Sequence, residues 1–305
     1  MTQMEKAKTV CALVGPTASG KTGASLAVAG ALHMEIVSAD SMQVYRGMDI
    51  GTAKVTPQER ALVPHHMIDI VEPYEKYTAA RYQSEGRAVV EEIFSRGKMP
   101  LIVGGTGLYV SALIDGMNFA ETEGGGEERH RWEEYLTHNG AQALHGRLCE
   151  IDPIAAARLH PNDTRRVIRA LEVHALTGET LSDKAKKREP FYHARIAGLS
   201  LEREVLYARI DERVLAMIQN GLQEEAKVLF SSHAPTAAQA LGYKELFGVF
   251  RGESTIEEAI PLIQRETRRY AKRQMTWFRR DQRIRWFDAG DADLIRSLTE
   301  YFKDA

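Results

Sequence analysis

The chain has 305 residues, of which 44% are hydrophobic and 27% charged, as in an ordinary soluble globular protein. Its length suits one large domain, or one domain with a smaller insertion. The formal net charge is −2, so any surface for a polyanion must be local. Cys11 and Cys149 are far apart in sequence, which argues against a disulfide framework or a zinc ribbon. With neither a membrane-length apolar run nor an apolar leader, we expect a cytoplasmic protein with no membrane partner, and nothing requires more than a monomer.

The first part of the chain alternates short apolar runs with helical patterns. Residues 9–14 predict a buried strand, and the alanine-rich residues 22–32 predict the helix that follows it. The next predicted elements are strands at 36–39, 67–71 and 100–103 and a helix at 78–96. This alternation predicts an α/β fold with a parallel sheet and flanking helices. We expect the strands at 9–14 and 36–39 to be neighbours in that sheet.

The pattern changes after Gly116, where the chain reads NFAETEGGGEER. From this Gly- and Glu-rich break to about Pro190 the pattern is helical and has no strand run. A strand is then expected at 195–201, long helices at 204–230 and 254–280, and a last strand at 284–287. We therefore predict an α/β core from residues 1–116 and 195–305, interrupted by a helical insertion at 117–194.

The strongest motif is GPTASGKT, which matches the phosphate-binding loop pattern G-x-x-x-x-G-K-[ST] between a predicted strand and a predicted helix. Its glycines permit the turn, and its amide groups and the helix N-terminus can cradle phosphate oxygens. The lysine supplies charge, and the last hydroxyl, that of Thr22, can bind Mg²⁺. The predicted phosphate site comprises Gly15, Pro16, Thr17, Ala18, Ser19, Gly20, Lys21 and Thr22.

Asp40 follows the predicted strand at 36–39, at the edge of the sheet where ligands bind in open α/β folds. Such a carboxylate can cap a turn, or it can act as a general base on an acceptor. Ser41 and Gln43 follow it and could read the edge of a nucleobase. Asp69 is the rival for a role at a metal, although as a lone acid it fits a structural role better. Thr106, in GGTGLY after the strand at 100–103, offers a hydroxyl to the same edge.

The C-terminal part of the chain is locally basic. Residues 265–285 contain nine Lys or Arg against two acids, a local net charge of +7. Helical spacing places several of these cations on one face and an apolar stripe, which includes Tyr270 and Gln274, on the other. A second cluster is RRVIR, residues 165–169. Charge runs are usually solvated faces, but two clusters on a nearly neutral chain indicate a polyanion such as RNA.

Seven motifs, in colinear order from Val10 to Trp286, resemble the bacterial tRNA dimethylallyltransferases. They are GPTASGKT, SADSMQVYRGMDIGTAK, PHHMIDIVEP, PLIVGGTGLY, RRVIRALEV, ALGYKEL and TRRYAKRQMTWFRR. The resemblance implies a P-loop NTPase-like core with a helical insertion, and a tRNA that contacts both through its anticodon stem-loop. It also implies transfer of the prenyl group of dimethylallyl diphosphate to N6 of the adenosine at tRNA position 37, with Mg²⁺ as cofactor.

The resemblance assigns roles to individual residues. Asp40 matches the general base, Thr106 a threonine near the reacting groups, and Arg213 the arginine at the leaving group, with Arg209 as the alternative. Residues 15–22 match the diphosphate site. The segment before Arg129 departs from the family pattern, which carries proline there. The residues expected to contact tRNA are Asp40, Ser41, Met42, Gln43, Arg129, Arg165, Arg166, Val167, Ile168, Arg169, Gly242, Tyr243, Lys244, Lys272, Arg273, Gln274 and Arg279.

Two other classes of function share some of these features. A small-molecule kinase would use the same phosphate loop, with Asp40 deprotonating a hydroxyl, but it would not need a long basic helix. A non-catalytic RNA-binding module would need the basic helix but not the phosphate loop.

Overall fold

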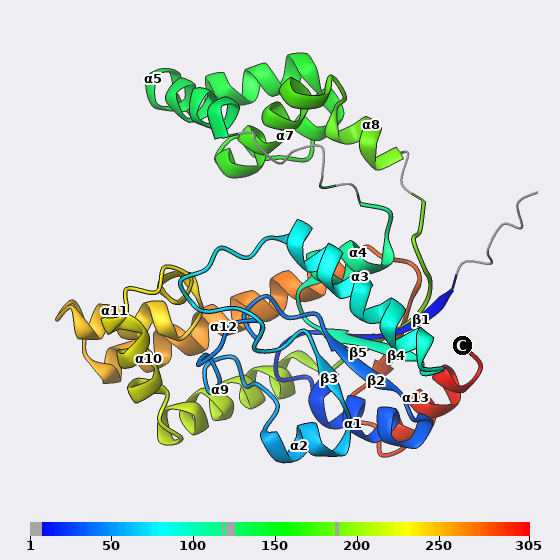
Figure 1. Ribbon diagram of the computed structural model, residues 1–305. Helices are drawn as coiled ribbons and strands as arrows, with labels where there is room; N and C mark the ends of the chain where they lie inside the picture. Colours follow the sequence, from blue (N-terminus) through cyan, green and yellow to red (C-terminus); the bar gives the residue numbers. More distant parts are fainter. Residues whose placement is uncertain (1–7, 118, 120–125, 187–188) are drawn as a thin grey trace, which may run out of the picture. The chain divides into compact units, whose positions relative to one another are not determined.

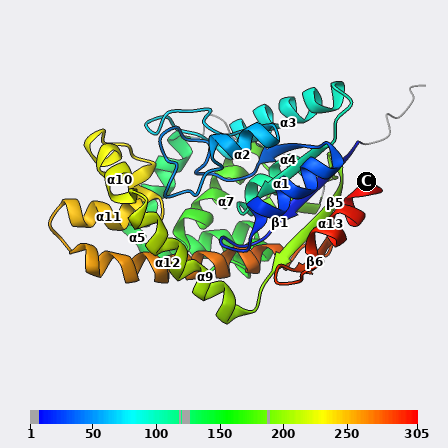
Figure 2. The ribbon, with the colours of Figure 1, turned by 90° about the horizontal axis from the view of Figure 1, so that it is seen from below.

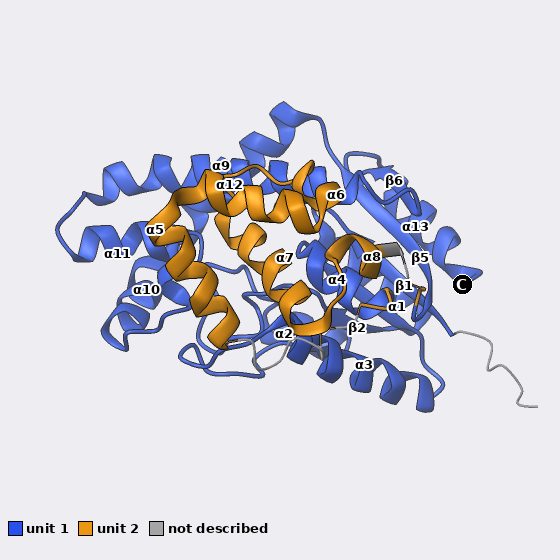
Figure 3. Cartoon of the chain, turned by 90° about the horizontal axis from the view of Figure 1, so that it is seen from above, with its two compact units in different colours: residues 1–114, 191–305 blue, residues 115–190 orange. Residues whose placement is uncertain are grey.

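The computed structural model of the protein describes residues 8–117, 119, 126–186 and 189–305. The chain forms two compact units: unit 1 consists of Met1–Ile114 and Phe191–Ala305, and unit 2 of Asp115–Pro190 (Figure 3). The sequence predicts the insertion at 117–194, so both of its boundaries lie a few residues earlier in the structure than expected. The second boundary comes earlier because the N–H groups of Phe191 and Tyr192 donate to the Ile114 carbonyl at 2.8 and 3.1 Å, which ties both residues to unit 1.

Within the described residues, unit 1 is built on a six-stranded parallel sheet with the order β3-β2-β4-β1-β5-β6 (Figure 1). β4 lies between β1 and β2, so the expectation that the first two strands are neighbours is wrong. Leu13 of β1 is in register with Val103 of β4 and Ala197 of β5. The strands are β1 (Thr9–Val14), β2 (Glu35–Ser38), β3 (His65–His66), β4 (Pro100–Gly104), β5 (His193–Ser200) and β6 (Ile284–Asp288).

The strand predicted at 67–71 is also wrong, because β3 ends at His66. Met67 and Asp69 have φ angles of 63° and 57°, in the left-handed region that an extended strand cannot contain. The Asp69 carboxylate accepts from Lys54 and Arg60, each at 2.6 Å. Both of its oxygens are therefore paired with cations, as a structural role requires.

Helices cover both faces of the sheet (Figure 1). The helices α1 (Lys21–Leu32) and α13 (Leu294–Lys303) pack on one face, and α3 (Ala79–Ser95) and α4 (Gly107–Ile114) lie on the other. Cys11 and Leu13 of β1 belong to the apolar core with Val28 of α1 and Phe302 of α13. The alternate residues of β1 are buried as well, as expected for a strand between two helical layers. The short helix α2 (Pro57–Leu62) is capped by the hydroxyl of Thr56, the residue before it.

Four more helices lie beyond the carboxyl ends of the strands (Figures 1 and 2): α9 (Arg203–Gln219), α10 (Leu222–Ser231), α11 (Tyr243–Phe250) and α12 (Ile256–Phe278). The single helix predicted at 204–230 is broken at Gly221, whose φ of 97° is left-handed. The helices α9 and α12 lie side by side, with Ile210 and Ala271 buried between them. These helices form a wall opposite the ends of the strands.

Unit 2 is helical, as the sequence predicts. It contains α5 (Gly126–Ile151), which is kinked at Gly140, and α6 (Pro153–Ala156), α7 (Thr164–Thr177) and α8 (Leu181–Lys186). Leu144 and Leu148 of α5 pack against Val167, Ile168 and Leu171 of α7. None of the helices formed by the described residues combines the length and apolar character needed to cross a bilayer.

Candidate active site

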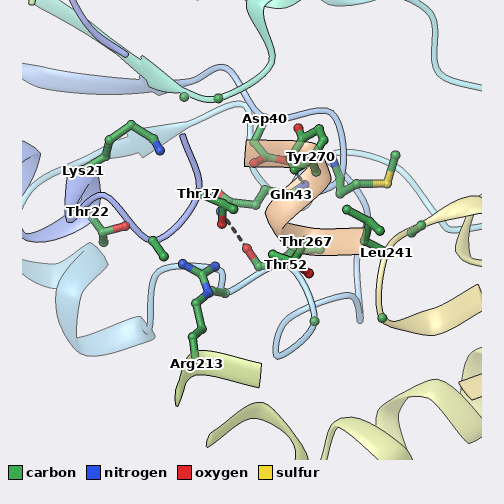
Figure 4. A pocket seen from close by; sticks show the side chains of 18 of the residues that line it. Thr17, Lys21, Thr22, Asp40, Gln43, Thr52, Arg213, Leu241, Thr267 and Tyr270 are labelled. Atoms are coloured by element: carbon green, nitrogen blue, oxygen red, sulfur yellow. Dashed lines mark hydrogen bonds between the residues drawn. The ribbon is translucent and has the colours of Figure 1, made fainter. Parts of the chain in front are cut away.

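A cavity of about 630 Å³ lies in unit 1, where the ends of the strands face α9, α11 and α12 (Figure 4). Its lining includes residues 17–22 of the phosphate loop and residues 40–43 after β2. Arg213 of α9, Tyr243 of α11 and Tyr270 of α12 complete the wall. Segments far apart in sequence therefore meet at the sheet edge where α/β proteins bind ligands.

The phosphate loop has its shape because two of its glycines adopt conformations that other residues avoid. Gly15 has a φ of 152°, and a Cβ there would lie 2.8 Å from the Leu199 carbonyl oxygen. Gly20, with a φ of 88°, precedes the first turn of α1. The Ser19 hydroxyl and the Lys21 ammonium both donate to the Pro16 carbonyl, at 2.8 and 2.6 Å. Thr17 to Thr22 line the cavity, whereas Gly15 and Pro16 shape the turn behind them.

Two cationic groups point toward the interior of the cavity, Lys21 from α1 and Arg213 from α9 (Figure 4). Burial lowers the pKa of Lys21 to about 7, with a further contribution from Arg213 that Asp40 opposes. Burial also lowers the pKa of Arg213, again against the effect of Asp40. Arg209, one turn earlier on α9, lines the cavity but is exposed. The geometry therefore favours Arg213 over Arg209 as the partner of an enclosed anion.

Asp40 faces the cavity from the loop after β2. Its Oδ1 atom accepts from the backbone N–H groups of Met42 at 2.9 Å and Gln43 at 3.4 Å, so one oxygen caps the turn. Thr106 lies behind this loop, where its Oγ1 accepts from the Ser41 N–H at 3.1 Å. Asp40, Ser41, Met42 and Gln43 all line the cavity, whereas Thr106 acts on it through Ser41.

Gln274 joins the phosphate loop to the loop after β4. Its Oε1 accepts from the Thr17 N–H at 2.8 Å, and its Nε2 donates to the Gly105 carbonyl at 3.0 Å. A Cβ on Gly105 would lie 2.1 Å from that nitrogen. The residue is only 6% exposed. Gln274 also lines the cavity, so its contact with tRNA stays a prediction, although its amide is engaged inside the protein.

Tyr270 lines the cavity, whereas helical spacing places it only in the packing stripe of the basic helix. It lies beside Asp40 (Figure 4), and its side chain is hydrogen-bonded to Thr106 and Gln274. Burial, and then the nearby Asp40 charge, raise the pKa of Tyr270 to about 12, so it stays protonated. Its position one helical turn before Gln274 is the signal that could have identified it.

The other residues of unit 1 expected to contact tRNA fall into two groups. Gly242, Tyr243, Lys244 and Arg273 line the cavity, while Lys272 and Arg279 are exposed on and just after α12 without lining it. Tyr243 is fully buried, and its hydroxyl donates to Glu225 at 2.6 Å. Since Tyr243 lines the cavity while its hydroxyl is bound to Glu225, its contact with tRNA stays a prediction.

Unit 2 carries the remaining residues expected to contact tRNA. Arg165 and Arg166 are exposed on the first turn of α7, while Val167 and Ile168 lie in its apolar core, which does not fit their predicted contact. The buried Glu172 carboxylate accepts from Arg129 at 3.1 Å and from Arg169 at 2.9 Å. Arg129 of α5 and Arg169 of α7, both predicted to contact tRNA, are therefore hydrogen-bonded to the same carboxylate.

A magnesium ion would fit the phosphate end of the cavity. Among the described residues no three His, Cys, Asp or Glu side chains are grouped as a metal site. Mg²⁺ often uses one or two protein ligands, together with water and phosphate oxygens. The Thr22 hydroxyl lies in the first turn of α1 on the cavity wall. With the Thr22 hydroxyl as the protein ligand, the site suits an ion whose other ligands are water and the oxygens of a bound diphosphate.

Comparisons with family models, with curated proteins and with solved structures all point to the same protein family. The IPP transferase family matches residues 43–281, and the isopentenyl transferase family matches residues 8–64. A tRNA dimethylallyltransferase of Carboxydothermus hydrogenoformans is 50% identical over 298 residues, which cover 96% of each chain. The solved tRNA isopentenylpyrophosphate transferase of Bacillus halodurans is 45% identical with a TM-score of 0.74, covering 98% of this chain and 96% of its own.

A solved eukaryotic dimethylallyltransferase acting on tRNA is 29% identical with a TM-score of 0.81. That match covers 96% of this chain and 78% of the eukaryotic one. The similarity thus runs through both units and includes the phosphate loop, the loop of Asp40 and the basic helix. This chain belongs to the tRNA dimethylallyltransferase family.

Proposed function

We propose that the protein transfers the dimethylallyl group of dimethylallyl diphosphate to N6 of the adenosine at position 37 of tRNA, in the anticodon stem-loop, and releases diphosphate. The observation that carries this proposal is the single cavity that joins a phosphate loop to the carboxylate of Asp40. The family membership supports the choice of donor and acceptor. We place the reaction in the cytoplasm and expect a monomer to perform it.

The phosphate end of the cavity suits the leaving group. As the bond between C1 of the prenyl group and the diphosphate oxygen breaks, the electron pair and a growing negative charge go to the diphosphate. Lys21, Arg213 and the amide groups of the loop are placed to meet that charge in an enclosed site, where it interacts most strongly. Thr22 would hold Mg²⁺, which supplies further positive charge to the bound diphosphate.

The other end of the cavity suits the acceptor. The lone pair of an adenine amino group is delocalised into the ring, so the amine is a weak nucleophile and becomes charged as it attacks. Transfer of an N6 proton to the Asp40 carboxylate, as the new N–C bond forms, leaves a neutral product. Because Asp40 lies inside the cavity, the adenosine must leave the anticodon stack to reach it, as in enzymes that act on flipped nucleotides.

A mass measurement tests the proposal directly. The protein is incubated with Mg²⁺, dimethylallyl diphosphate and an unmodified tRNA transcript, and the digested nucleosides are weighed. We expect one adenosine per tRNA to gain one prenyl group, and a transcript with guanosine at position 37 to gain none. A parallel reaction with ATP in place of the prenyl donor tests the kinase alternative. Absence of prenylated adenosine under turnover conditions would reject the proposed function.

A further inference from the structure

Two of the sequence motifs are only partly explained by the chemistry above: RGMDIGTAK, residues 46–54, and ALGYKEL, residues 240–246. The structure brings them together at Glu225 of α10. The Glu225 carboxylate accepts from the backbone N–H groups of Asp49 and Ile50 at 2.9 Å and of Gly51 at 3.1 Å. It also accepts from the Tyr243 hydroxyl at 2.6 Å. One acid therefore holds three consecutive amides and a phenol.

The packing around this carboxylate leaves little room for another arrangement. A Cβ on Gly51 would lie 2.5 Å from the Tyr243 ring, so the turn can approach the ring only with glycine at this position. Tyr243 is fully buried at the start of α11. Burial and the Glu225 charge raise the pKa of Tyr243 well above its usual value, which keeps the hydroxyl a donor.

The held turn continues directly into the acceptor end of the cavity. The Thr52 carbonyl accepts from the Gln43 side-chain amide at 3.3 Å, and the Gln43 N–H in turn lies 3.4 Å from Asp40 Oδ1. Gly51, Thr52 and Ala53 themselves line the cavity. Lys54 secures the end of the same loop by donating to the Tyr45 carbonyl at 2.7 Å. None of these bonds involves residues 15–22 of the phosphate loop.

We infer that Glu225 is a positioning residue that fixes the turn at 49–52, and through it Gln43 and Asp40, for the acceptor adenosine. This inference rests on the proposed function, because it assigns the adenosine to the Asp40 end of the cavity. Glu225 itself touches neither substrate. Its effect is selective, since it orders the wall on the acceptor side and leaves the phosphate side unchanged.

The test compares Glu225→Gln with Tyr243→Phe and with a control, Glu224→Gln. Glu224 is the preceding residue of α10 and is exposed. Its replacement by glutamine makes the same chemical change at a side chain that does not hold the turn. We expect Glu225→Gln to raise the KM for tRNA about tenfold, the scale of a lost charged hydrogen bond, with the KM for dimethylallyl diphosphate unchanged. Tyr243→Phe should act in the same direction but less strongly, and Glu224→Gln should match the wild type.

A second readout needs no substrate. In the free protein, hydrogen exchange at the amides of Asp49, Ile50 and Gly51 should accelerate in Glu225→Gln, while exchange in the phosphate loop stays at the wild-type rate. Equal changes in both KM values, or unchanged exchange at these amides, would overturn the inference. If Glu225→Gln fails to fold, Tyr243→Phe decides by the same two measurements. Failure of the proposed function is distinguishable, because the wild type would then prenylate no tRNA while the exchange result would still stand.

Discussion

The protein carries two kinds of charged side chain, and their surroundings differ sharply. Lys21, Arg213 and Asp40 face the cavity, and burial shifts the pKa values of both cations downward. Arg265 and Arg269 of α12 instead have side chains 57% and 60% exposed. Enclosed charges interact strongly with a ligand and respond to pH, whereas exposed charges are screened by water and salt. The first kind suits chemistry on a small anion and the second suits binding of a long one.

The exposed arginines are also partly neutralised by acids on their own helix or just before it. Glu266 lies 2.6 Å from Arg269 and 3.5 Å from Arg265, and Asp163 lies 3.4 Å from Arg166 on α7. Such surface pairs contribute little to stability. A polyanion can therefore replace these acids at small cost. Five predictions test this contrast between enclosed and exposed charge.

The largest effect is expected from Asp40→Asn. Asparagine keeps an oxygen that can accept from the Met42 and Gln43 amides, so the turn should survive, but it cannot take up a proton. We expect kcat to fall roughly 10²–10⁴-fold, the usual share of a general base, with the Kd for tRNA nearly unchanged. Single-turnover prenyl transfer and filter binding measure the two quantities. Activity near the wild-type level would remove Asp40 from its proposed role.

The next effect separates two arginines of α9. Arg213→Gln removes an enclosed cation near the diphosphate, so we expect kcat to fall about 10²–10³-fold, as when one donor to the transition state is removed. Arg209→Gln is the matched control, because Arg209 is exposed one turn earlier on the same helix. Its kcat should change only a few fold. The reverse ranking would show that Arg209 meets the leaving group.

The third prediction concerns pH. The pKa of Lys21 is lowered to about 7 in the ligand-free protein, so its ammonium is present below pH 7 and is lost as the pH rises above it. A bound diphosphate favours the charged form. The Kd for dimethylallyl diphosphate should therefore be flat just below pH 7 and rise by up to about tenfold per pH unit above it. Titration calorimetry across pH 6.5–9 would measure this dependence.

Lys21→Met supplies the control for the pH experiment. Binding should be weak at every pH, and the rise above pH 7 should disappear. A rise of the same steepness in this variant would assign it to another group.

The sequence predicts some features of the enclosed charged site and not others. The phosphate loop and Asp40 were predictable, because each follows a buried strand and the carboxyl ends of parallel strands share one edge. The strand order was not, since nothing in residues 9–14 or 36–39 shows that β4 lies between β1 and β2. The break at Gly221 was missed because helical periodicity continues on both sides of one left-handed residue.

The residues that support the site were harder to predict than those that face it. Glu225 belongs to none of the motifs, and its three amide partners come from residues 49–51, far away in sequence. Tyr243 and Gln274 lie in motifs, but their burial depends on how α11 and α12 pack, which sequence spacing does not give. Exposed arginines such as Arg265 followed from composition and helical spacing alone.

The smallest expected effect lies on the exposed face of α12. Arg265→Ala and Arg269→Ala should each weaken tRNA binding a few fold and reduce the slope of log K against log salt by about 0.7–0.9 for each phosphate that the protein no longer neutralises. Filter binding between 50 and 200 mM salt measures both quantities, and kcat at saturating tRNA should stay constant. An unchanged slope would mean that this face is only solvated.

Glu266→Gln provides the opposite test on the same face. The acid lies against both arginines, so removing its charge frees them for phosphate and raises the local positive potential. We expect slightly tighter tRNA binding at low salt, and no difference from the wild type at high salt, where the exposed charges are screened. Since Glu266 does not line the cavity, the KM for dimethylallyl diphosphate should not change. A loss of tRNA affinity would instead mean that Glu266 orders the two arginines for binding. The exposed charges, like the enclosed ones, would then depend on neighbouring side chains for their position.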